Sequence, residues 1–288
     1  MRGGGESNLK LTPGAGRDAL AAHPNSPMQL GLYIDIKNGP VLPNDQFDFI
    51  EENVQTLLVP EADEAAFRER LAIVRGLGRP VLAANRLLPA DLRPVGPVID
   101  APRLQRWGET VFRRAEEVGV KRVVWGSGAS RRLADDFPRD KAREQFIRAV
   151  ASFAPFAERH GVTIVIEPVC RTDSNFIMSL ADGADIVQAV GHPNVRLLAD
   201  NYHMDIEGEP ATEIERFAAL LEHVHVSEIK RRAIPGTTDY DLRPYLRALK
   251  NAGYNGTLAI EPEWTDVNTE PAKALAALRA QMADAGLN

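Results

Sequence analysis

Eight short apolar runs, separated by amphipathic stretches, dominate the sequence from residue 29 onward. Each run is too short for a helix and too continuously apolar for a strand with one exposed face, which is typical of strands buried in a parallel sheet. The expected strands lie at residues 30–35, 56–60, 80–85, 121–126, 162–167, 195–200, 222–227 and 257–261. Eight such strands, each followed by a helix, predict an α/β fold that closes as a single (β/α)₈ barrel.

Glycines mark the ends of the expected helices between these strands. The amphipathic stretches at 63–78, 139–161 and 241–254 each contain a glycine just past the last periodic apolar residue, which indicates a left-handed C-cap. The first expected helix, at residues 44–53, is short. The long connection at 87–102 is predicted to form a loop over one mouth of the barrel.

The chain divides into an N-terminal extension and one catalytic domain. Residues 1–28 are rich in Gly, Pro and small polar residues and lack the apolar core of a signal peptide, so we expect a disordered or loosely packed extension. No linker or change of composition interrupts residues 29–285, so the barrel domain is expected to cover 29–288. The single cysteine, Cys170, excludes an internal disulfide and is compatible with a reducing, cytoplasmic location.

The charge balance limits the kinds of partner. A formal net charge of -6 and a pI near 5.6 disfavour binding to nucleic acid or to an anionic membrane, which both need concentrated positive charge. No apolar stretch approaches the roughly 20 residues that span a bilayer. We therefore expect a small-molecule partner, no nucleic acid and no membrane, and we leave a homo-oligomer open.

Four consecutive expected strands end in or near a residue that can bind a metal ion. The apolar run at 162–167 ends in Glu167, and the run at 257–261 ends in Glu261; a proline follows each glutamate. Asp200 ends the run at 195–200, and His225 lies near the end of the run at 222–227. Because catalytic residues of such barrels sit at the C-terminal strand ends, we expect these four side chains to meet at one mouth.

The chemistry of these four residues points to a divalent cation. Two carboxylates about 4 Å apart repel by about 4 kcal/mol at an effective dielectric of 20, so a positive charge is expected among three of them. Three carboxylates and one imidazole suit Mn²⁺, which we favour, or Mg²⁺ or Co²⁺; the absence of thiolates argues against a structural zinc site. His223 shares a strand face with His225 and stays open as an alternative ligand.

Four segments resemble the xylose isomerase-like barrel superfamily, within it the sugar isomerase and epimerase branch that includes ketose 3-epimerases, hydroxypyruvate isomerase and inosose-processing enzymes. They are "IVIEPVCR", "VRLLADNYHMDIE", "HVHVSEIKRRAIPG" and "ALKNAGYNGTLAIEPEW". The resemblance is specific over residues 160–264 and architectural over residues 29–159.

The resemblance implies roles for individual residues. Glu167, Asp200, His225 and Glu261 fall on the four metal ligands of the family, and the two glutamates also fall on its acid/base pair. His203 and Arg231 fall on positions that contact substrate oxygens. Asp173 falls where the epimerases commonly carry a glutamate that contacts the substrate.

These residues predict an isomerase or epimerase that acts on a sugar or a related polyol ketone. A divalent ion that holds a carbonyl and its neighbouring hydroxyl lowers the cost of removing the proton between them, through a metal-stabilised enediolate. One glutamate would take the proton and the other would return it, which inverts the carbon or moves the carbonyl.

Three alternatives remain at this point. The first is a lyase or dehydratase that acts on a keto-sugar, keto-inositol or 3-keto-glycoside with the same metal site. The second is a DNA-repair endonuclease, since abasic-site endonucleases share the barrel; the acidic balance argues against it. The third is a non-catalytic sugar-binding protein that has kept the fold.

Overall fold

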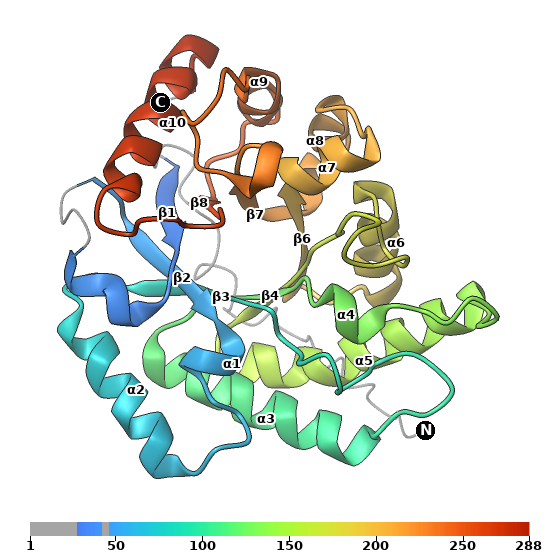
Figure 1. Ribbon diagram of the computed structural model, residues 1–288. Coiled ribbons are helices and arrows are strands. Elements are labelled where there is room, and N and C mark those ends of the chain that lie inside the picture. Colours follow the sequence, from blue (N-terminus) through green and yellow to red (C-terminus); the bar gives the residue numbers. More distant parts are fainter. Residues whose placement is uncertain (1–27, 42–45, 288) are drawn as a thin grey trace, which may run out of the picture.

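Eight parallel strands close into one barrel, in the order in which they occur along the chain (Figure 1). The computed structural model describes residues 28–41 and 46–287. The strands are β1 (Gln29–Tyr33), β2 (Phe49–Asn53), β3 (Val81–Asn85), β4 (Arg122–Trp125), β5 (Thr163–Ile166), β6 (Val195–Asp200), β7 (Leu221–Val226) and β8 (Thr257–Ile260). The predicted single (β/α)₈ barrel is confirmed.

Helices form the outer layer around the strands (Figure 1). The α-helices are α1 (Val54–Leu57), α2 (Glu64–Gly76), α3 (Ala101–Val118), α4 (Gly128–Arg131), α5 (Arg139–Arg159), α6 (Leu180–Val190), α7 (Asn201–Glu207), α8 (Thr212–Arg216), α9 (Arg243–Asn251) and α10 (Glu270–Ala285). Three 3₁₀ turns are η1 (Ile36–Val41), η2 (Ala218–Leu220) and η3 (Lys230–Arg232). Within the described residues, no helix has the length and apolar character that crossing a bilayer requires.

The predicted helix ends are confirmed where glycine follows a helix. The turn after α5 passes through Gly161 at φ 62°, and the turn after α9 passes through Gly253 at φ 64°. A residue with a Cβ is strained in this left-handed region, which explains why glycine stands at these positions.

The second strand does not lie where it was predicted. Residues 56–60 were expected as a strand and 44–53 as a helix; instead β2 covers Phe49–Asn53, and the segment "TLLVP" lies in α1 and the turn after it. The prediction was wrong because Glu51 and Glu52 make β2 look like an exposed helix, although both carboxylates are buried. Leu57 and Leu58 are buried against the helical layer, which gave their segment its apolar, strand-like pattern.

The interior of the barrel is apolar at its base, toward the N-terminal ends of the strands, and polar toward their C-terminal ends. Val124, Val165 and Leu198 pack together from three neighbouring strands, separately from the large core between strands and helices. Phe49 fills another part of the base; a Cβ at Gly31 would overlap its ring, so glycine is needed there. Among the described residues, the cavity that reaches the barrel interior lies at the polar end.

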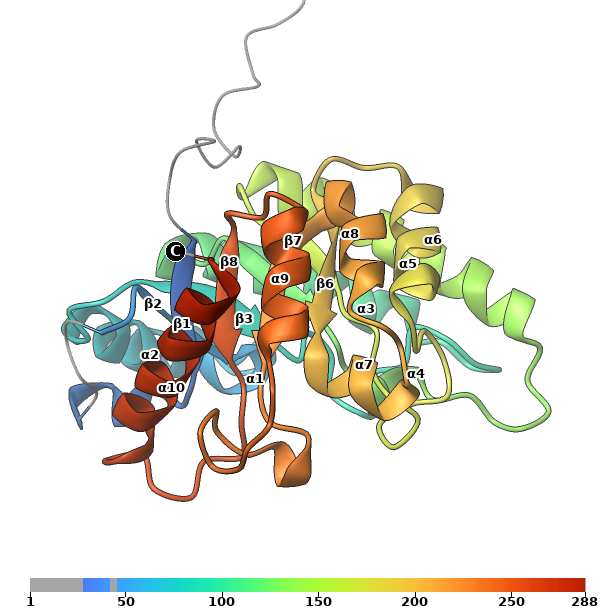
Figure 2. The ribbon, with the colours of Figure 1, turned by 90° about the horizontal axis from the view of Figure 1, so that it is seen from above.

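Short elements gather at the C-terminal ends of the strands. Helices α1, α4 and α7 follow β2, β4 and β6 at once or after a short turn, and Figure 2 shows them along the same edge of the barrel. The long connection before α3 also reaches this end, since its Leu88 and Ala90 line the cavity there. The predicted extension at residues 1–28 lies outside the described residues, except for Met28.

Candidate metal centre

Four buried side chains meet at the C-terminal ends of β5 to β8. Glu167 directly follows β5, Asp200 ends β6, His225 lies in β7, and Glu261 directly follows β8. One potential ligand atom from each of the four residues lies within 4.8 Å of all the others. The structure therefore brings together all four residues predicted as metal ligands.

The two glutamates are held at equivalent places just beyond their strands. The Glu167 amide continues the ladder to the carbonyl of Trp125 at 3.4 Å, and the Glu261 amide bonds to the carbonyl of Val226 at 3.0 Å. The proline that follows each glutamate has no N–H, so the ladder stops there. Each Glu-Pro pair thus places a carboxylate at the rim of the barrel.

Two residues that follow β4, Gly126 in the loop and Arg131 at the end of α4, fix Glu167. A Cβ at position 126 would overlap the Glu167 carboxylate, so only glycine allows this side chain its place. The fully buried guanidinium of Arg131 donates to the carbonyls of Trp125, at 2.8 Å, and Glu167, at 2.6 Å. The conformation of Glu167 therefore depends on residues about 40 positions earlier in the chain.

His225 directs one ring nitrogen toward the cluster and the other away from it. Its Nδ1 lies 3.1 Å from Glu167 Oε1 and 2.9 Å from Glu261 Oε2. Its Nε2 lies 3.1 Å from Glu51 on the opposite side of the barrel interior. His223, the alternative ligand, lies outside the four-residue cluster and contacts Glu51 instead, with its Nε2 2.8 Å from Oε2.

Arg232 supplies positive charge beside the carboxylates. Its guanidinium lies 2.7 Å from Asp200 Oδ2 and also forms an ion pair with Glu261, and its Nε donates to the Glu261 carbonyl at 3.0 Å. The guanidinium also stacks over the ring of Tyr202 at 4.7 Å, where a cation interacts favourably with the aromatic face. Arg232 thus binds two of the four clustered residues directly.

The pKa values of the cluster follow from burial and from these neighbours. Burial alone would raise the pKa of Glu261, but Arg232 and His225 together lower it well below its usual value. Burial would also raise the pKa of Glu51, yet His225 and His223 bring it down to about 2. Burial would lower the pKa of His225, whereas Glu51 and Glu261 hold it well above its usual value. The carboxylates of Glu261 and Glu51 are therefore ionised at neutral pH.

The donor set fits a hard divalent cation. The cluster offers three carboxylates and one imidazole nitrogen, with no thiolate, and this oxygen-rich set suits Mn²⁺, Mg²⁺ or Co²⁺. All four residues are at most 7% exposed, so their mutual repulsion is poorly screened by water. A bound cation would relieve that repulsion, and it would displace the proton that the acidic neighbours favour on His225.

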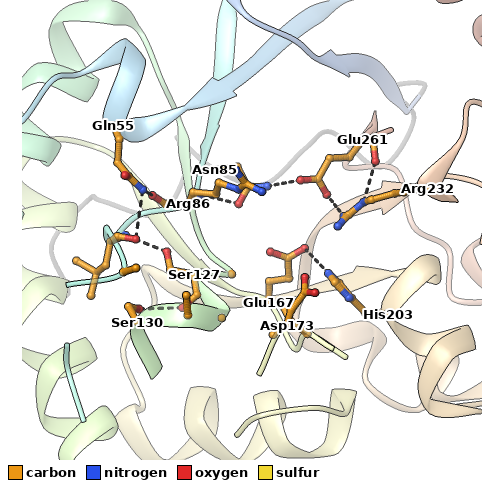
Figure 3. Close-up of a pocket in the computed structure, with 16 residues that line it drawn as sticks. Gln55, Asn85, Arg86, Ser127, Ser130, Glu167, Asp173, His203, Arg232 and Glu261 are labelled. Atoms are coloured by element: carbon orange, nitrogen blue, oxygen red, sulfur yellow. Dashed lines mark hydrogen bonds and ion pairs between the residues drawn. The ribbon is translucent and has the colours of Figure 1, made fainter. Parts of the chain in front are cut away.

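A cavity of about 480 Å³ opens beside the cluster. Its volume lies in the range of small-molecule sites. Figure 3 shows Gln55, Asn85, Arg86 and Ser127 on one side and Glu167, Asp173, His203, Arg232 and Glu261 on the other. Polar groups thus face the cavity from both sides.

Two of the three predicted substrate contacts line this cavity. His203 is buried, and its Nδ1 accepts the Cys170 amide at 3.1 Å, so in the neutral ring the proton lies on Nε2. Asp173 lines the cavity as an exposed carboxylate. Arg231 is exposed and is not among the lining residues; its neighbour Arg232 takes that place.

Three residues of the site were not predicted from the sequence. Glu51 was missed because its segment was expected to be a helix rather than the second strand. Asn85 ends β3, and its Nδ2 donates to Glu261 Oε1 at 2.7 Å. The sequence did contain a pattern that indicates Asn85, since the apolar run "VLAAN" ends in this polar residue, just as two other runs end in Glu167 and Asp200. Arg232 could not be told from Arg231 by pattern alone.

Comparison with known proteins identifies the family of this chain and several relatives. Residues 47–283 match the family model described as xylose isomerase-like TIM barrel. L-ribulose 3-epimerase of Mesorhizobium japonicum is 29% identical over 221 residues, 75% of this chain and 71% of that protein. D-psicose 3-epimerase of Ruminiclostridium cellulolyticum is 32% identical over 120 residues, and the match spans only 41% of either chain.

The fold of a solved relative is also similar. An L-ribulose 3-epimerase structure superposes with a TM-score of 0.75 and 23% identity, covering 90% of this chain and 96% of that one. At this identity, the similarity concerns the fold alone. The two sequence relatives carry epimerase names, in agreement with the class of enzyme expected from the sequence.

Proposed function

The chain belongs to the xylose isomerase-like TIM barrel family, and from that premise we propose that it is a divalent-metal-dependent epimerase or isomerase of a ketose or related keto-polyol. The observation that carries the proposal is the convergence of Glu167, Asp200, His225 and Glu261 beside a polar cavity of sugar-compatible size. The epimerase names of the relatives support the same reaction class.

The four clustered residues would hold the ion, which we propose to be Mn²⁺. The His225 ligand atom would be Nδ1, because this nitrogen faces the carboxylates. When bound, a divalent ion of this kind polarises the carbonyl and adjacent hydroxyl of the substrate and so acidifies the intervening C–H bond.

Glu167 and Glu261 are the proposed acid/base pair. They come from β5 and β8, which are separated by two strands, so their carboxylates approach the site from different directions. One ionised carboxylate takes the proton from carbon. The other, once protonated, returns a proton to the opposite face of that carbon, which gives an epimer, or to the neighbouring carbon, which gives an isomer.

Polar residues around the cavity would orient the substrate. His203 presents Nε2–H for a substrate oxygen, and Asp173 can accept a hydroxyl proton. We move the proposed arginine contact from Arg231 to Arg232, because Arg232 lines the cavity. Arg232 also lowers the pKa of Glu261 and so keeps this carboxylate ionised.

Solvent-exchange measurements test this function. The protein, freed of metal and then supplied with Mn²⁺, is incubated in D₂O with ketoses, keto-inositols and 3-keto-glycosides, and products are followed by NMR. We expect deuterium at the carbon next to the carbonyl and a product of otherwise unchanged composition. Exchange should fall by about 10²–10⁴-fold in Glu167→Gln and Glu261→Gln.

The control variant is Glu263→Gln, an exposed glutamate two residues beyond Glu261. It should exchange like the wild type. A product that has lost water or a glycosidic leaving group would support the lyase instead. Absence of exchange with every substrate in the metal-loaded protein would contradict the proposal.

A further inference from the structure

A fully buried carboxylate lies behind the proposed metal ligand His225. Glu51 on β2 has no exposed surface, and it contacts both histidines of β7. Its Oε2 is 2.8 Å from His223 Nε2, and both of its oxygens are 3.1 Å from His225 Nε2. Strands β2 and β7 are not neighbours in the barrel, so these contacts cross its interior.

The chain of contacts continues to β8 through His223. Its Nδ1 lies 2.6 Å from Thr257 Oγ1 and 3.0 Å from the Thr257 carbonyl. That carbonyl already accepts a hydrogen bond from the Tyr254 hydroxyl at 2.8 Å. The Thr257 hydroxyl is close enough to donate to His223 Nδ1.

One arrangement of protons gives each contact of Glu51 and His223 a donor and an acceptor. Thr257 Oγ1–H donates to His223 Nδ1, His223 Nε2–H donates to Glu51, and His225 Nε2–H donates to Glu51 as well. A neutral imidazole has a single N–H, so a cation that displaces the second proton of His225 meets a lone pair on Nδ1, the nitrogen that faces Glu167 and Glu261. If His223 carried its proton on Nδ1 instead, its Nε2 lone pair would face the Glu51 carboxylate at 2.8 Å.

We infer that Glu51, His223 and Thr257 form a positioning chain that holds His225 in the tautomer and orientation needed to bind the metal through Nδ1. The inference rests on the proposed function, since it concerns the same metal. Carboxylates that accept the distal N–H of a ligating histidine fix the ring in this way and raise its basicity.

A second metal ion between Glu51, His223 and His225 is the competing interpretation, because their ligand atoms also lie within 4.8 Å of one another. In that case His225 would have to ligate two ions through its two nitrogens and lose both ring protons. The hydrogen-bonded chain requires no such deprotonation.

Metal affinity, measured on the full chain, tests the inference without any substrate. The protein is stripped with a chelator and titrated with Mn²⁺ by calorimetry, and ¹⁵N NMR reports the tautomer of the histidines. Glu51→Gln should bind Mn²⁺ about 10–100-fold more weakly than the wild type. The amide must point an N–H at one of the imidazoles, which moves a proton to the far nitrogen of that ring.

The matched control is Glu52→Gln, the next residue of the same strand. Glu52 is also buried, but its carboxylate accepts the amides of Ile36, at 2.6 Å, and Asn53, at 2.7 Å, away from the histidines. This variant should bind Mn²⁺ like the wild type. Thr257→Val, which removes only the hydroxyl, should weaken binding by a smaller factor and serves as the test if Glu51→Gln does not fold.

The possible outcomes separate this inference from the proposed function. A wild-type protein that binds no Mn²⁺ would overturn both. One ion per chain in the wild type, with unchanged affinity and tautomer in Glu51→Gln and Thr257→Val, would overturn the positioning chain alone. Two ions per chain, with one lost in Glu51→Gln, would establish a second metal site in place of the chain of hydrogen bonds.

Discussion

Strands β5 to β8 carry all four proposed metal ligands, whereas β2 to β4 and the loop after β4 carry the residues that hold those ligands in place. Glu51 contacts His225, Asn85 contacts Glu261, and Gly126 leaves room for Glu167. We call β5 to β8 the binding half and β2 to β4 with the following loop the supporting half, although His223, Thr257 and Arg232 in the binding half also make positioning contacts. A site built in this way should be as sensitive to the supporting half as to the binding half.

Gly126→Ala should have the largest effect among changes in the supporting half. The new Cβ would overlap the Glu167 carboxylate and displace it. A displacement of about 1 Å at a reacting group can lower a rate by about 100-fold, and the D₂O exchange rate measures this. The control is Gly76→Ala at the end of α2, where a Cβ meets nothing within 4 Å. An unchanged exchange rate in Gly126→Ala would show that the site does not depend on this residue of the supporting half.

Metal binding should stabilise the folded protein through the binding half. Mn²⁺ at 100 times its Kd is expected to raise the free energy of unfolding by about 2.7 kcal/mol, because only the folded chain assembles the site. Asp200→Asn, which removes a ligand, should reduce this gain strongly in a denaturant titration. Asp284→Asn, an exposed position in α10, should keep it in full. An equal gain in both variants would place the metal elsewhere.

Asn85→Asp should lower the exchange rate by about tenfold or more. Asn85 Nδ2 donates to Glu261 Oε1 at 2.7 Å, and a hydrogen bond to a charged group contributes about 1.5–3 kcal/mol. The aspartate would present an oxygen to the glutamate instead. The same change at Asn251, whose amide donates to Glu215 at 3.0 Å on the exposed surface, should leave the rate unaltered. A similar loss in both variants would argue against a role for Asn85 at the site.

The supporting half should also make the stability of the protein depend on pH, through Glu52 on β2. Burial raises its pKa from 4.5 to about 7. Because the folded state holds this proton more tightly than the unfolded chain, its contribution to stability is complete below about pH 4.5 and is lost as the pH rises through about 7. Glu52→Gln should therefore gain about 2–3 kcal/mol relative to the wild type between pH 5 and pH 8. Denaturant titrations at both pH values measure the gain, and a constant difference would contradict it.

The binding half could be predicted from the sequence because each of its functional residues interrupts an apolar pattern. Glu167 and Glu261 end runs that are otherwise apolar, and a buried carboxylate is unfavourable unless it is paired or binds a metal. Asp200 and His225 follow the same rule. The barrel geometry then brings strand ends together, so local pattern was enough to name the cluster.

The supporting half was harder to predict, because Glu51 lies inside the barrel rather than at the end of an apolar run. In "FIEEN" the two glutamates conceal a strand, and nothing local shows that Glu51 will meet two histidines about 170 residues later. In the basic loop after β7, the prediction chose Arg231 rather than Arg232 for another reason. Arg231 and Arg232 both adopt positive φ, 58° and 48°, so no regular period predicts which one reaches the cavity.

The contact between Glu51 and His225 joins residues 174 positions apart, and that between Asn85 and Glu261 joins residues 176 apart. During synthesis Glu51 and Asn85 are therefore made well before His225 and Glu261. A nascent chain that lacks β8 has neither a closed barrel nor the complete cluster. A metal ion held by all four residues would therefore stabilise only those chains in which β8 has paired with β1 and closed the barrel.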